Sequence, residues 1–137
     1  VVEAVAAHAK DAGARIHIHL SETQTEHEEC RQRHGLTPAA YMEAHGIFDS
    51  PTTAAHCVWL EDEDFDILKK HNVSVACCPA SNLKLASGYA NIPKMLEKGI
   101  NIALGTDGAA SNNNLNILQI FTCSAWYTRV SITILRC

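Results

Sequence analysis

Strand-like and helical stretches alternate along this 137-residue chain, and this alternation constrains the fold more than any other feature. The strand-like stretches are short, and they are β-branched or alternate apolar with polar residues. They cover residues 15–20, 52–58, 73–77 and 100–104. The helical stretches cover residues 1–10, 23–34, 37–46, 61–71 and 92–98. Strands separated by helices form parallel βαβ units, so the sequence predicts an α/β fold with a parallel sheet.

Two segments do not follow this alternation. Residues 80–91 are rich in Ser, Asn and Gly, and we expect a loop there. Residues 119–137 are β-branched, aromatic and Cys-rich, without the amphipathic pattern of a packed helix. We therefore expect one domain over residues 1–118, followed by a tail that contributes little to the fold and arises from a cloning, frameshift or gene-prediction artefact.

Composition excludes several classes of protein. Hydrophobic residues make up 47% of the chain and charged residues 19%, which is more apolar than disordered chains. The net charge of −4 offers no basic surface for nucleic acid. No apolar run approaches the ~20 residues that span a membrane, and the first residues lack the pattern of a secretory signal. We expect a cytoplasmic protein whose six cysteines, without any CxxC pair, are reduced and mostly buried.

Polar residues that can perform chemistry follow the carboxyl ends of the predicted strands. His19 and Glu22 follow the first strand, His56 lies in the second, and Asp107 follows the fourth. In a (β/α)₈ barrel this end of the strands carries the active site. Imidazole and carboxylate ligands suit zinc, and a further carboxylate can move protons to and from water. No Gly-rich phosphate-binding turn follows any strand, which argues against a nucleotide-binding domain.

Each of these residues also has a structural interpretation. His56 could be a core histidine, Glu22 a carboxylate at a helix start, and Asp107 part of a Thr-Asp-Gly turn. His17 shares a strand face with His19 and is expected to pack rather than to bind metal. The other histidines fall on helices or helix ends and are expected at the surface. These are His8, His27, His34, His45 and His71.

The phrases HIHLSET, AAHCVWL, PASNLKLASG and ALGTDGAASNNN resemble the amidohydrolase superfamily, and within it the 5-methylthioadenosine/S-adenosylhomocysteine deaminases of the chlorohydrolase-related branch. The resemblance covers about residues 1–118. It implies a distorted (β/α)₈ TIM-type barrel with a metal at its mouth, of which this chain supplies about strands 5–8. The pair of histidines that the family carries on strand 1 is absent from this sequence.

The resemblance also implies a role for each matching residue. His19 and Asp107 match metal ligands, with zinc expected and iron as the alternative. Glu22, His56, Asp107 and Ser111 match substrate-binding positions. In the implied reaction Asp107 accepts a proton from water, Glu22 protonates a ring nitrogen, and His56 stabilises developing charge. The catalytic residues are thus Glu22, His56 and Asp107, and the reaction is hydrolytic deamination of an adenosine-type nucleoside, with release of ammonia.

Three alternatives stay open at this point. The chain could belong to a guanine deaminase or to a triazine or chloro-hydrolase of the same superfamily. It could also be a non-catalytic fragment that has lost its metal. Half a barrel leaves unpaired strand edges, so we expect the isolated chain to be inactive and to self-associate as a homo-oligomer.

Overall fold

The computed structural model describes the backbone of residues 1–134 and the side chains of residues 1–125. Four parallel strands form one sheet in the order β1-β2-β3-β4. The strands are β1 (Ile16–Leu20), β2 (Thr52–His56), β3 (Ser74–Cys77) and β4 (Ile102–Leu104). The helices are α1 (Val2–Asp11), α2 (Gln24–His34), α3 (Pro38–Ala44), α4 (Asp62–Lys70), α5 (Pro79–Lys84), α6 (Ile92–Glu97), α7 (Ile117–Ile134) and the short η1 (Ile47–Asp49). The predicted α/β fold with a parallel sheet is confirmed.

The helices begin and end where local chemistry satisfies their free backbone groups. The Thr23 side chain accepts a hydrogen bond from the Glu26 amide at 3.2 Å and caps α2, and Gly35 ends that helix in the left-handed conformation at φ 70°. Helix α4 begins with a capping box between Glu61 and Asp64, and it has acidic residues in its first turn and lysines in its last turn.

The two faces of the sheet have different environments. Ile16 and Leu20 of β1 are buried, whereas His17 and His19 point to the opposite, exposed face. The register pairs His19 with Ala55 of β2, so His19 and Ala55 share that face. The buried side chains on the helix-covered face continue through the other strands and helices. They include Ala54, Phe65, Leu68, Val75, Cys77 and Met95.

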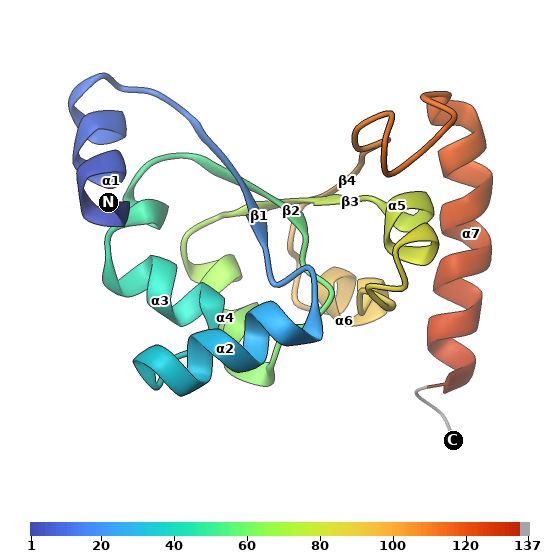
Figure 1. The fold of residues 1–137 in the computed structure, drawn as a ribbon, viewed down its shortest axis with the longest axis horizontal. Coiled ribbons are helices and arrows are strands. Elements are labelled where there is room, and N and C mark those ends of the chain that lie inside the picture. The colour runs from blue at the N-terminus through green and yellow to red at the C-terminus, as the bar shows by residue number, and fades with distance from the viewer. Residues whose placement is uncertain (135–137) are drawn as a thin grey trace.

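Figure 1 shows α2, α3 and α4 gathered on one side of the sheet, while α7 stands beside α5 at the end of the molecule away from α1. None of the described helices has the length and apolar character needed to cross a membrane. The carboxyl ends of β1 and β2 and the turn after β4 carry the residues that the sequence singled out.

Two expectations from the sequence are wrong. The segment 80–91, expected to be a loop, begins inside α5, with Pro79 in the first turn of this helix. The segment after residue 118, expected to lack a packed helix, is helical through Ile134 and places a nearly fully buried Ile120 against the domain. Residues 135–137 of the predicted tail lie outside the described part of the chain.

Candidate functional site

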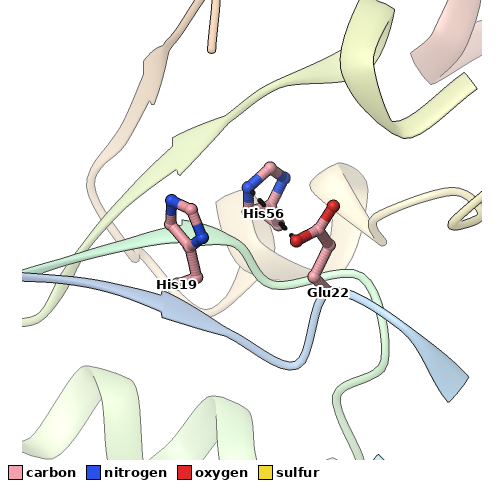
Figure 2. A group of neighbouring side chains, drawn as sticks. All are labelled: His19, Glu22 and His56. Carbon is pink, nitrogen blue, oxygen red and sulfur yellow. Dashed lines mark ion pairs between the residues drawn. The ribbon is translucent and has the colours of Figure 1, made fainter. Parts of the chain in front are cut away.

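Three side chains from β1, β2 and the turn after β1 meet at one edge of the sheet. His19, Glu22 and His56 each offer a ligand atom, and these atoms all lie within 4.8 Å of one another (Figure 2). The two imidazole rings meet edge to face, with their centroids 5.0 Å apart. His19 is exposed, Glu22 is partly buried, and His56 is 1% exposed at its side chain. The sequence prediction that these residues converge is consistent with this geometry.

The backbone of His56 explains how its side chain reaches the cluster. Side chains alternate along a strand, so His56 would share the helix-covered face with Ala54. Its φ of 71° lies in the left-handed region, which breaks the alternation at the last residue of β2. A left-handed conformation is strained for a residue with a Cβ and is found at functional sites more often than elsewhere. Here it accompanies an imidazole placed beside His19 and Glu22.

The two ring nitrogens of His56 have different surroundings. Nδ1 lies 2.8 Å from Oδ1 of Asn82, inside the protein. Nε2 is buried and has no hydrogen-bond partner among the described residues. It lies 3.7 Å from a Glu22 carboxylate oxygen and 4.0 Å from Oδ2 of Asp107. A buried polar atom without a partner is costly, and such an atom points to a missing water, ion or ligand.

Asp107 is held as a carboxylate beside His56. Its burial acts to raise the pKa, but hydrogen bonds from the Ser81 hydroxyl at 2.5 Å, the Ser111 hydroxyl at 2.7 Å and the Gly108 amide outweigh this effect. The pKa of Asp107 is lowered to about 2 as a result. Asp107 also has a left-handed backbone, with φ at 61°. It is therefore an ionised, fixed oxygen donor.

Glu22 is fixed by the start of α2. The carboxylate of Glu26 accepts hydrogen bonds from the amides of Ser21 at 2.8 Å and Glu22 at 2.7 Å, which ties the turn after β1 to the helix. The Ser87 hydroxyl lies 3.5 Å from the Glu22 carboxylate. The Glu22 side chain is 20% exposed, so it can still meet water and a small molecule from solvent.

This donor set fits a divalent cation. Two imidazoles and two carboxylates surround the site, and within the described residues the only ion-pair partner of Glu22 and Asp107 is His56. Imidazole nitrogen and carboxylate oxygen are ligands that zinc accepts. The nearby thiol of Cys78 does not compete, because burial and the charges of Asp107 and Glu22 raise its pKa to about 11. In the structure the ligand atoms of His19, Glu22 and His56 form the cluster, whereas the resemblance named His19 and Asp107 as the metal ligands.

Sequence reasoning missed the residues that support the cluster. Ser81 and Asn82, adjacent at the start of α5, contact Asp107 and His56, and Ser87 approaches Glu22. Ser111, which the resemblance proposed as a substrate contact, also donates a hydrogen bond to Asp107. The phrase SNLKLASG was conspicuous in the sequence. However, only the fold shows that its polar side chains point to the other site residues.

The family model of the amidohydrolase family matches residues 1–132. The chain belongs to the amidohydrolase family. The resemblance read from the sequence is confirmed, and the match runs past residue 118 into α7. The amidohydrolase family is a hydrolase family, which agrees with the predicted enzyme class.

Individual relatives agree with this assignment. The chain is 58% identical over 111 residues to the 5-methylthioadenosine/S-adenosylhomocysteine deaminase of Caldanaerobacter subterraneus subsp. tengcongensis, covering 81% of this chain and 26% of that protein. It is 45% identical over 117 residues to the 5'-deoxyadenosine deaminase of Methanothermobacter thermautotrophicus, covering 85% and 27%. A solved adenosine deaminase from Xanthomonas campestris with bound zinc superposes with a TM-score of 0.91 at 31% identity, covering 96% of this chain and 30% of that one. The chain thus spans about a quarter of the length of these curated relatives.

Proposed function

We propose that this chain is the metal-site portion of an enzyme that hydrolytically deaminates an adenosine-type nucleoside. 5-Methylthioadenosine and S-adenosylhomocysteine are the proposed substrates, and the products are the inosine analogue and ammonia. The observation that carries the proposal is the convergence of His19, Glu22 and His56, with the buried, unpartnered Nε2 of His56 facing two carboxylates. The names of the relatives at 45% and 58% identity support the substrate class.

We assign the metal to His19 and Asp107, with zinc as the proposed ion. When bound, such an ion acts as a Lewis acid and makes water acidic enough to ionise near neutral pH. The lowered pKa of Asp107 supports its assignment, because a ligand must be ionised. In this proposal residues 1–118 form about strands 5–8 of the barrel, and α7 follows them and packs against the same domain.

The chain's own residues then divide the proton transfers. Asp107 accepts a proton from the attacking water. Glu22, partly exposed at the cluster, donates its proton to a ring nitrogen of the purine, takes up the proton of the added hydroxyl as the carbonyl forms, and passes that proton to the departing amine. The proton held by Asp107 then returns Glu22 to its starting state. His56 stabilises the charge that develops at the carbon under attack. Ser111 keeps the Asp107 carboxylate in place and lies where a substrate hydroxyl could meet it.

The test uses the full-length protein that contains this chain. Glu22→Gln is expected to retain zinc and to release ammonia from either substrate at least ~100-fold more slowly, the usual contribution of a positioned acid or base. His19→Ala and Asp107→Ala are expected to lose zinc and activity together. Glu29→Gln removes an exposed carboxylate that pairs with Arg33 on α2, so this control should behave as wild type. Normal turnover by Glu22→Gln would overturn the role assigned to Glu22.

A further inference from the structure

Asn82 is a buried polar residue to which the proposed reaction assigns no role. It lies in α5, has no exposed surface, and places Oδ1 2.8 Å from Nδ1 of His56. An amide oxygen can only accept a hydrogen bond, so Nδ1 of His56 must be the donor and must carry the proton. The opposite nitrogen of the neutral ring, Nε2, then presents a lone pair to the cluster of His19, Glu22 and Asp107.

We propose that Asn82 is a positioning residue that holds His56 in its Nδ1–H tautomer, so that the unprotonated Nε2 faces the cluster of His19, Glu22 and Asp107. This inference rests on the proposed function for its catalytic meaning. The tautomer itself is a property of the chain alone. Without an acceptor beside Nδ1, the proton could sit on Nε2, where two carboxylate oxygens at 3.7 and 4.0 Å would attract it.

Hydrogen bonds of its neighbours hold the backbone at Asn82 in place. The Ser87 amide donates to the Asn82 backbone carbonyl at 2.8 Å, and the Trp59 indole donates to the Ser87 carbonyl at 2.7 Å. The neighbouring Ser81 hydroxyl donates to Asp107 at 2.5 Å. One segment thus fixes His56 and Asp107 from consecutive residues. A shift of this segment would disturb both, whereas a change of the Asn82 side chain removes the hydrogen bond to His56 directly.

The experiment reads the tautomer directly. In the full-length protein labelled with ¹⁵N-histidine and stripped of metal, the ring-nitrogen shifts of His56 are measured by NMR at alkaline pH, where the imidazole is neutral. The His56 signal is assigned by its disappearance in His56→Gln. The wild-type protein should show a protonated Nδ1 and an unprotonated Nε2. Asn82→Leu keeps a similar volume but lacks the acceptor, so its signal should move toward the Nε2–H form.

Two further variants complete the design. Asn82→Asp keeps an acceptor oxygen and should retain the Nδ1–H signal. This variant can be measured even when Asn82→Leu does not fold. Asn91→Ala removes a comparable side-chain hydrogen bond, the 3.1 Å cap to the Lys94 amide of α6, without touching the cluster, and should leave the His56 signal unchanged. In the zinc-loaded protein Asn82→Leu should keep its zinc and lose ~10–100-fold in kcat, with recovery in Asn82→Asp.

The outcomes separate the two proposals. An Nε2–H signal in the wild-type protein, or an unchanged signal in folded Asn82→Leu, overturns the role of Asn82. A wild-type protein that shows the expected tautomer but deaminates neither substrate refutes the proposed function and leaves the tautomer assignment standing. The predicted shift in Asn82→Leu, together with its absence in Asn82→Asp and Asn91→Ala, supports the inference.

Discussion

Replacing Ile120 with alanine tests whether α7 is an integral part of the fold. Ile120 is 2% exposed, and α7 contacts α5, α6 and β4. The change removes three buried carbons worth ~0.8 kcal/mol each, or ~2.4 kcal/mol before any cavity. A residual cavity adds to this, so Ile120→Ala should lower the free energy of unfolding by ~2–5 kcal/mol. Leu118 of the same helix is 76% exposed, and Leu118→Ala should cost only ~0.5 kcal/mol.

The assay is urea unfolding of the 137-residue chain and the two variants, followed by far-UV circular dichroism. The midpoint should fall strongly for Ile120→Ala and barely for Leu118→Ala, while the slope stays the same. If both variants unfold within ~0.5 kcal/mol of wild type, α7 does not pack against the domain, and the expectation of a dispensable tail would be reinstated for this segment.

Three further predictions concern charge, metal and packing at the site. Because the folded pKa of Asp107 is lowered to about 2, its carboxylate stabilises the fold above its ordinary pKa of 3.8, and this contribution is lost as pH falls toward 2. Urea stabilities of wild type and Asp107→Asn should therefore converge near pH 2, and a constant gap would contradict the assignment. Removal of the metal with a chelator should lower the Tm of the full-length protein. Added zinc should restore the Tm of wild type but not that of His19→Ala, and restoration in this variant would exclude His19 as a ligand. Gly105→Ala should cost ~1–3 kcal/mol, since its Cβ would lie 2.9 Å from the Cys78 sulfur, and unchanged thermal unfolding would refute that clash.

The parts of the fold that the sequence predicted are those determined by local chemistry. The Thr23 cap, the Gly35 stop and the charge gradient of α4 all act within a few residues, and these helices form where expected. Helix α5 was missed because its polar residues resemble a loop. They are helical and buried because their hydrogen bonds go to side chains 26 residues away along the chain, as with Asn82 and His56.

Long-range contacts explain the other differences as well. His27 was expected at the surface, but it is buried, and its Nε2 lies 2.9 Å from an oxygen of Glu61, the N-cap residue of α4. Residues 117–134 have an unfavourable composition for a helix, yet the start of this helix packs against the domain through Ile120, and this packing overrides the propensity. For the site, strand ends predicted which residues meet. The left-handed turn that re-aims His56 has no signature in the sequence, because φ at a histidine depends on the surrounding fold.

The left-handed residues at the strand ends set a limit on how this protein can be engineered. Ser21 destabilises the fold in two ways: its backbone is left-handed, with φ at 49°, and its buried hydroxyl has no partner among the described residues. His56 and Asp107 also have a left-handed backbone, but they carry the proposed chemistry. A library selected only for thermal survival should accept glycine at Ser21 and would also tolerate glycine or asparagine at His56. Such a selection would yield robust, inert variants unless activity is screened in every round.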